Sequence, residues 1–328
     1  MRSSAFDRVP ACILCNQRVN SPDDVTWEDV LVPFYFTATR GEPSASKGVG
    51  TPSTKSGRLK GGSRAAAIKA TPAPIKLEPH EVLAGYALEI LSASGLRQHT
   101  ITVLVDNKLV SLWYFDRSGV ISSTEMDLET AVGRDMLYTV LGVFSLANRD
   151  DMGYVRRIFP GTEWPFPENV GGLHLRDRKG TPKSWELANL TKLNTGSRGL
   201  IGRGTTVYSF GDDEKDFDAP FALKLSWQPI SRLPEAKFFE AAENAGVEGI
   251  PRFLAGDELA NLSEGIRGRL QCSLNIGAEQ SDRELRALVF DRVCRPLNEF
   301  PIMERPLDFL RIFKQLIISA CLPCRPLS

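Results

Sequence analysis

The 328-residue sequence predicts an α+β fold in two parts: a small α+β module, followed by a five-stranded antiparallel sheet with one flanking helix. Two observations predict it. Between residues 80 and 147, two runs with helical spacing of apolar residues enclose a pair of strand-like runs. Beyond residue 199 the expected order is strand, glycine turn, strand, lysine-bearing strand, helix and two further strands.

The charge balance argues against a general attraction to nucleic acid or membrane, because 40 basic and 40 acidic residues cancel. No apolar run approaches the roughly 20 residues that span a bilayer. The N-terminus, MRSSAFDRVPACILC, lacks the long apolar stretch of a secretory signal. We therefore expect an intracellular protein, cytoplasmic or nuclear, without membrane association.

Four regions are expected along the chain. Residues 1–38 are weakly patterned, and residues 39–79 read as a disordered linker rich in Gly, Ser, Pro and Lys. Residues 80–175 form the α+β module and residues 176–328 the sheet-and-helix domain. The linker is basic, which fits either a nucleic-acid patch or a solvated segment. We favour the solvated segment, since no aromatic residues interleave for base stacking, so nucleic acid is an unlikely partner.

The α+β module is expected to contain two helices around a hairpin. The first helix runs through EVLAGYALEILSASGL and ends near Gly95. Strands 100–105 and 109–115 follow, joined by an Asp-Asn-Lys turn, and a second turn at 116–119 leads into strand 120–122. The second helix spans about 127–147. The apolar faces of the two helices are Val82, Leu83, Tyr86, Ile90 and Leu91, and Met136, Leu137, Val140, Leu141 and Phe144.

Polar residues of this module leave two interpretations open. Together they could form a nuclease-like metal site; alternatively, Asp116 caps its own turn and His99 is a surface residue, which we favour. The residues concerned are Glu89, Arg97, His99, Asp116 and Arg117.

The cysteines also leave two interpretations open. Cys12 and Cys15, and Cys321 and Cys324, have the spacing of zinc ligands. The pairs lie at opposite chain ends with no accompanying histidine, so we favour reduced thiols.

The most informative stretch is LIGRGTTVYSFGDDEKDFDAPFALKLSW. Leu200 to Phe210 is predicted as strand, glycine turn and strand. Gly202 and Gly204 would let backbone amides approach a phosphate, although hairpins also use glycine for φ alone. Lys224 follows Gly202 by 22 residues on an apolar strand, with Ala222 on the same face. An ammonium group there requires an anionic partner.

A helix after this strand would supply that partner. Ser231 is a candidate N-cap, and Gly246 ends a run in which Ala236, Phe239, Ala242 and Ala245 recur at helical spacing. Glu235 lies in the first turn, with Glu240 and Glu243 further along.

These features together resemble the small lobe of the protein kinase superfamily, and more narrowly the fungal-type protein kinase family. One similar stretch is GYALEILSASGLRQHTITVLVDNKLVSLWYFDRSGVISS, in that family's N-terminal extension. Others are LIGRGTTVYSF, ALKLSW, RLPEAKFFEAAENAGVEGIPRFL and RALVFDRVCRPLNEF. The resemblance covers roughly residues 80–318 and implies an ATP-dependent Ser/Thr-type phosphotransferase that uses ATP and Mg²⁺.

The resemblance also implies roles for individual residues. Gly202 and Gly204 would be phosphate-loop glycines. Lys224 and Glu235 would form the catalytic ion pair that orients the nucleotide phosphates, with Glu240 and Glu243 as alternatives to Glu235. At the other end of the nucleotide, the adenine pocket and the backbone of the following linker would be formed by Phe290, Asp291, Arg292 and Val293.

Two departures from the family pattern shape the functional expectation. Thr206 or Val207 stands where a third loop glycine is expected, and the sequence contains no His-Arg-Asp triplet and no Asp-Phe-Gly-like triplet. We therefore expect a chain truncated before the catalytic loop, inactive as a kinase and stabilised little by nucleotide. The alternative is a pseudokinase-like module that binds nucleotide or a protein partner, the partner covering the exposed face of the lobe.

Overall fold

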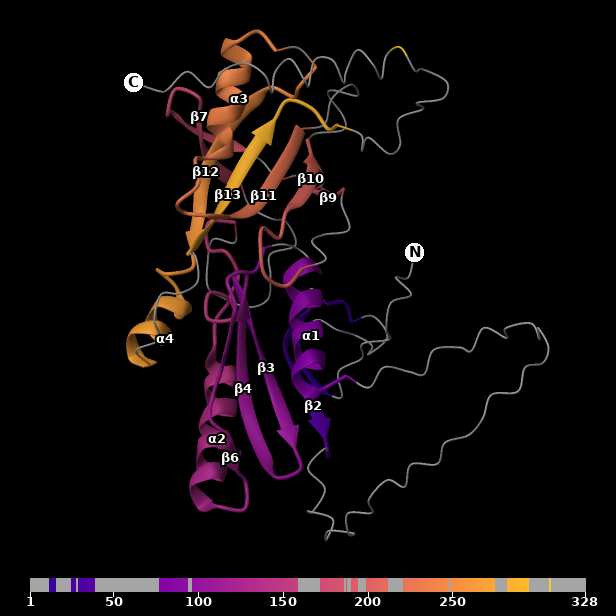
Figure 1. The fold of residues 1–328 in the computed structure, drawn as a ribbon, viewed down its shortest axis with the longest axis vertical. Coiled ribbons are helices and arrows are strands. Elements are labelled where there is room, and N and C mark those ends of the chain that lie inside the picture. Colours follow the sequence, from indigo (N-terminus) through magenta and orange to yellow (C-terminus); the bar gives the residue numbers. More distant parts are fainter. Residues whose placement is uncertain are drawn as a thin grey trace, which may run out of the picture.

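A computed structural model gives the fold as two β-sheets with helices packed on them (Figure 1). The predicted α+β class is confirmed. Among the residues that the structure describes, no helix is long and apolar enough to cross a membrane. The described residues are 12–15, 25–27, 29–38, 77–93, 96–158, 172–185, 187, 190–193, 199–211, 221–247, 249–274, 282–294 and 307.

The first sheet contains the predicted hairpin and further strands from the N-terminal region. Its order is β1-β2-β3-β4-β5, with β6 also paired to β4; β2 and β3 are parallel and the other pairs antiparallel. Two strands thus come from the region expected to be weakly ordered, where Pro33 interrupts the apolar pattern. The strands are β1 (Cys12–Cys15), β2 (Val30–Thr37), β3 (His99–Asp106), β4 (Leu109–Asp116), β5 (Val120–Ser122) and β6 (Met126–Asp127).

Two helices pack on this sheet, α1 (Pro79–Ala93) and α2 (Ala131–Leu146). The predicted apolar face of α1 is largely buried, with Leu83 and Tyr86 in a cluster with Phe115 of β4. On α2 the prediction was too broad: Phe144 is buried, but Met136 and Leu141 are exposed. The reason is that α2 packs mainly along β6 and the sheet margin (Figure 1), so few of its side chains reach the core.

The second sheet contains four of the five predicted antiparallel strands and three strands that were not predicted. Its order is β8-β7-β12-β13-β11-β10-β9, and every pair is antiparallel. The strands are β7 (Leu173–Asp177), β8 (Pro182–Trp185), β9 (Thr191–Lys192), β10 (Thr206–Phe210), β11 (Phe221–Pro229), β12 (Phe253–Asn261) and β13 (Arg283–Phe290); the helices are α3 (Glu235–Asn244) and α4 (Ile266–Leu274).

Two local predictions in this part were wrong. Leu200 is not in a strand, since the strand that pairs with β10 is β9, upstream of the glycines. Ser231 is not the N-cap of α3; Pro234 occupies that position with extended backbone. A residue before proline is pushed out of the helical region, so a helix could not run through Leu233 into Pro234.

The polar residues of the first module serve its fold. Arg97 is buried and donates hydrogen bonds to the carbonyls of Val30, Leu31 and Met152. His99 is buried rather than exposed: its Nε2 lies 3.1 Å from the carbonyl of Asp151 and its ring stacks on Tyr114. The described residues contain no group of three or more side chains that could hold a metal ion.

The turn at Asp116 is formed as predicted. Oδ1 of Asp116 accepts hydrogen bonds from the amides of Ser118 and Gly119, at 2.7 and 2.9 Å. Cys12 and Cys15 are free thiols in β1; Cys321 and Cys324 lie outside the described residues.

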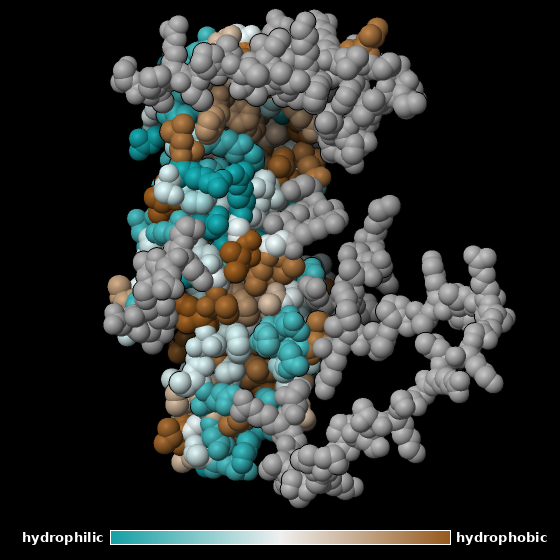
Figure 2. All heavy atoms as spheres, viewed as in Figure 1, coloured by the Kyte–Doolittle hydropathy of each residue, from teal (hydrophilic) through white to brown (hydrophobic). Residues whose placement is uncertain are grey.

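The two sheets share hydrophobic packing through the connection between them. Tyr154, Val155 and Ile158 are buried in one cluster with side chains of both sheets. Figure 2 shows hydrophobic residues reaching the visible surface near the same junction. The first module therefore lies directly against the second sheet.

Burial makes His99 a source of pH-dependent stability. Desolvation lowers its pKa from 6.5 to about 4, so between these values the unfolded chain binds a proton that the folded chain does not. Stability should therefore fall as the pH drops from 6.5 towards 4, by up to about 1.4 kcal/mol per pH unit. Urea unfolding of the wild type and of His99→Gln at a series of pH values measures this contribution. Parallel pH profiles of the two proteins would contradict it.

Candidate functional site

Lys224 and Glu235 form an ion pair on one face of the second sheet. Lys224 extends from the middle of β11, and its Nζ contacts Oε1 of Glu235 in the first turn of α3. Their side chains are 24% and 27% exposed, so both are partly withdrawn from water. In a strand, alternate residues share a face, which is why Ala222 and Lys224 both lie towards the helix.

Further hydrogen bonds hold Glu235 in this position. Gln228, on the same face of β11 as Lys224, donates from Nε2 to Oε2 of Glu235 at 3.4 Å and to Oγ of Ser226 at 2.9 Å. Nη1 of Arg286 on β13 donates to Oε1 of Gln228 at 3.1 Å. Sequence reasoning missed Gln228, although strand alternation from Lys224 places it on this face.

The other two candidate glutamates on α3 are committed elsewhere. Glu240 pairs with Lys237 at 2.8 Å, and Glu243 pairs with Arg178 beyond β7 at 2.7 Å. Of the three carboxylates weighed from the sequence, Glu235 is therefore the one that the structure brings to Lys224.

The end of β13 forms an apolar cluster on the same face. Phe290 is buried, with its ring edge-on to Phe239 of α3 at 4.8 Å between centroids. It clusters with Ala222 and Leu288, and Val293 packs against them. Because Ala222 pairs with Phe290 and Lys224 with Leu288, the aromatic wall and the lysine lie two residues apart along one face.

The segment after Phe290 is held to the neighbouring strand. The amide of Asp291 donates to the carbonyl of Arg252 at 3.1 Å, and Oδ1 of Asp291 accepts from the amide of Arg252 at 2.9 Å. Burial raises the pKa of Asp291, but the hydrogen bonds from Arg292 and from the Arg252 amide outweigh it and lower the pKa overall. Asp291 is therefore ionised, and its carboxylate holds the segment after β13 against Arg252.

The glycine-rich segment lies at the far end of β11 from Phe290. Gly202 and Gly204 both have positive φ, of 121° and 49°, which favours glycine at each position. The carbonyl of Arg203, between them, accepts from the amide of Trp227 on β11 at 2.7 Å. The amide of Gly202 donates to the carbonyl of Arg117 in the first module, at 2.9 Å. Val207, near the place of a third glycine, is a strand residue paired with Lys224.

A cavity of about 480 Å³ opens beside Glu235. Arg203 lines it from the glycine-rich segment and Arg232 from the connection between β11 and α3, with Phe238 and Phe239 of α3 forming apolar wall. The charges of Arg232 and Arg203 also act on Arg283 of β13, whose pKa is lowered first by burial and then by these two guanidinium groups. Several cations beside one cavity favour an anionic ligand. The sequence prediction included neither Arg203 nor Arg232.

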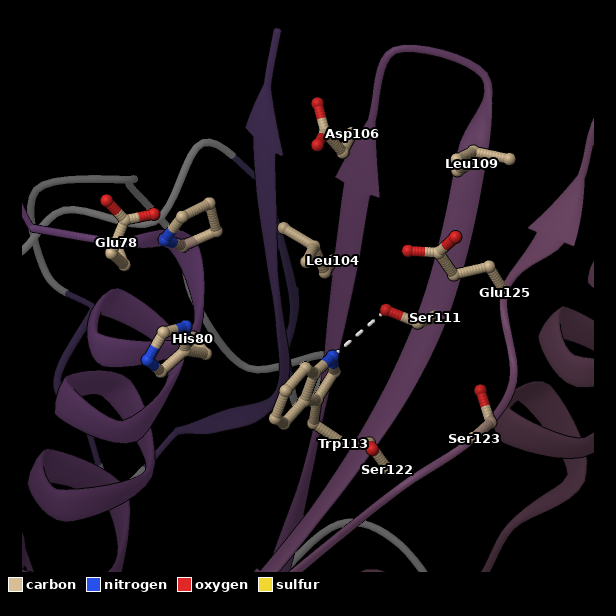
Figure 3. Close-up of a pocket in the computed structure, with 11 residues that line it drawn as sticks. Glu78, His80, Leu104, Asp106, Leu109, Ser111, Trp113, Ser122, Ser123 and Glu125 are labelled. Atoms are coloured by element: carbon tan, nitrogen blue, oxygen red, sulfur yellow. Dashed lines mark hydrogen bonds between the residues drawn. The ribbon is translucent and has the colours of Figure 1, made fainter. Parts of the chain in front are cut away.

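The first module has a separate polar cavity of about 360 Å³. Figure 3 shows it between the start of α1, with Glu78 and His80, and the strands that carry Asp106 and Trp113. The indole Nε1 of Trp113 donates to Oγ of Ser111 at 2.9 Å and closes part of the floor. No residue predicted for the functional site lines this cavity.

A comparison with protein families matches residues 69–319, more than half of the chain, to the family described as fungal protein kinase. The match spans the first module from α1 onwards together with the second sheet. No curated protein and no solved structure shows a significant match.

The Lys224–Glu235 pair should contribute measurably to stability. We expect a coupling free energy of about 1 kcal/mol from a double-mutant cycle of Lys224→Met and Glu235→Gln in urea unfolding. The pair Lys237–Glu240 on the same helix, with a lysine that is 56% exposed, is the matched control and should give about 0.3 kcal/mol. Equal couplings for the two pairs would show that Glu235 is no better placed than a surface carboxylate.

Proposed function

The chain belongs to the fungal protein kinase family, and we propose that its second sheet with α3 is a nucleotide-binding small lobe related to ATP-dependent Ser/Thr phosphotransferases. In this proposal Lys224 binds the nucleotide phosphates. The adenine base lies against Phe290, and backbone groups of residues 291–293 bind its polar edge.

The observation that carries the proposal is the Lys224–Glu235 ion pair beside a cavity lined by arginines. Protein kinases use a strand lysine, held by a helix glutamate, to orient the α- and β-phosphates. Here Glu235 holds the ammonium group against the sheet face that also carries Phe290. Phe290 lies at one end of this face, and Lys224 and the arginine-lined cavity lie towards the other. This arrangement suits a ligand with a flat aromatic base and an anionic tail.

The donor set fits ATP better than it fits a protein-bound metal. Arg203, Lys224 and Arg232 are suited to phosphate oxygens. Mg²⁺ prefers carboxylates and phosphates, and the described residues hold no group of three or more side chains for a metal ion. In this proposal, Mg²⁺ enters with the nucleotide and is held chiefly by its phosphates.

We assign binding rather than phosphoryl transfer to these 328 residues. Transfer requires a residue that accepts the proton of the attacking hydroxyl and a carboxylate that holds the metal on the phosphates. The sequence contains neither a His-Arg-Asp nor an Asp-Phe-Gly triplet to supply them. A nucleotide-binding role together with free thiols supports an intracellular location.

Millimolar Mg-ATP should raise the melting temperature of the 328-residue chain slightly, by about 2 °C. Lys224→Met should abolish this shift, because the ammonium group that meets the phosphates is lost. Lys237→Met, which removes an exposed lysine of α3, is the matched control and should keep it. Differential scanning fluorimetry with Mg-ATP and Mg-AMP measures the effect. The proposal fails if the wild type shows no shift, or if both variants shift like the wild type.

A protein-binding module is the second candidate, and exposed apolar residues beside the cavity favour it. Leu233, just before α3, and Phe238 on α3 are 50% and 60% exposed, and exposed apolar side chains at one place mark interaction surfaces. Wild-type protein should then show concentration-dependent association in sedimentation, which Phe238→Glu removes. A monomer at all concentrations, with a nucleotide shift, would favour the first candidate.

A further inference from the structure

The turn between β4 and β5 of the first module contacts the glycine-rich segment with both backbone and side chain. The carbonyl of Arg117 accepts from the amide of Gly202 at 2.9 Å. Its guanidinium donates from Nη1 to the carbonyls of Gly199 and Leu200, at 2.8 and 3.2 Å. One residue thus holds the segment on both sides of Ile201.

The same guanidinium binds the end of α1. Nη2 of Arg117 donates to the carbonyl of Leu91 at 2.7 Å. Nζ of Lys192, which precedes the glycine-rich segment in β9, donates to the carbonyls of Ser92 and Ala93. The last carbonyls of a helix lack partners within the helix and attract cations, and the last turn of α1 contains no basic residue of its own. Both ends of the connection from β9 to β10 are therefore attached to the first module.

Arg117 is held in place by its burial and by the anchoring of the adjacent Asp116. Arg117 is 1% exposed, and burial lowers its pKa to about 10. The adjacent carboxylate is not its counter-ion: Asp116 forms a bidentate pair with Arg267 of α4, with Nη2 of Arg267 2.8 Å from Oδ1. Asp116 anchors the turn to the second part of the chain, and Arg117 is left to carbonyl groups of α1 and the glycine-rich segment.

We propose that Arg117 is a positioning residue for the nucleotide site: it holds residues 199–204 on the first module so that Arg203 lines the cavity beside Glu235. Gly202 and Gly204 flank Arg203, and both contact Arg117. The link to nucleotide rests on the proposed function, whereas the holding of the segment does not. In this arrangement the first module is part of the nucleotide site.

The two glycines differ in a way that makes the proposal testable. A Cβ on Gly204 would lie 2.5 Å from Nε of Arg117, whereas a Cβ on Gly202 would meet nothing within 4 Å. Alanine is strained at both positions, but backbone strain alone gives the opposite order: φ of 49° at Gly204 lies in the left-handed region that other residues adopt at a cost, whereas φ of 121° at Gly202 is nearly confined to glycine. Gly202→Ala is therefore a control for strain without the collision.

The experiment measures amide hydrogen exchange of residues 199–204 in the full chain without nucleotide. Arg117→Met, which keeps the bulk but loses the donors, should speed exchange by about tenfold. Gly204→Ala should speed it in the wild-type background but add little in the Arg117→Met background, because its collision partner is gone. Gly202→Ala should speed it by the same factor in both backgrounds.

Affinity for Mg-ATP is the second readout. Arg117→Met and Gly204→Ala should each raise the Kd for Mg-ATP by about three- to tenfold through loss of preorganisation. Arg117→Lys, which keeps a cationic donor, should raise the Kd less than Arg117→Met does. Unchanged exchange in a folded Arg117→Met variant overturns the positioning role. If that variant does not fold, unchanged exchange of residues 199–204 in a folded Gly204→Ala variant overturns it. Absence of Mg-ATP binding in the wild type overturns the proposed function and leaves the exchange result to decide the positioning role.

Discussion

The register between β11 and β13 is the constraint on which the site depends. Lys224 faces Leu288 and Ala222 faces Phe290, so one face of the sheet carries an apolar wall at one end and an ammonium group near the middle. A shift of one residue would turn Lys224 to the opposite face, where Leu223, Leu225 and Trp227 now lie in the main core. The register is thus specified by burial on that core face, and the polar face follows from it.

Glu235 is positioned by the same register. Ser226 and Gln228 continue the polar face of β11 beyond Lys224, and Arg286 on β13 supports Gln228 from the side. Chains of hydrogen bonds of this kind restrict each member to one rotamer. The ion pair is therefore held by the sheet and by the start of α3 together, which suits a site whose lysine must keep its position without bound ligand.

The sequence predicted the order of elements because hydrophobic periodicity reports which face of a strand or helix is buried. It predicted Glu235 in the first turn of α3, yet placed the N-cap at Ser231, because the effect of Pro234 on the preceding residue was not weighed. It missed β1 and β2: β1 pairs with β2, and β2 joins the sheet by pairing with β3, more than 60 residues later in the chain. Long-range pairing of this kind leaves no local signal.

The glycines show most clearly what sequence alone could not separate. Glycine at these positions was expected either to let backbone amides approach a phosphate or to supply the φ of a hairpin, and positive φ also suits close packing on a partner. In this fold the amide of Gly202 is bound by a carbonyl 85 residues earlier in the chain, and Gly204 leaves room for a buried guanidinium. Gly204 therefore leaves room for the neighbouring module and Gly202 is bound to that module through its backbone amide, so the glycine-rich segment and the first module form one structural unit here. A side chain at Gly204 would have to displace Arg117, and with it the anchor at the end of α1.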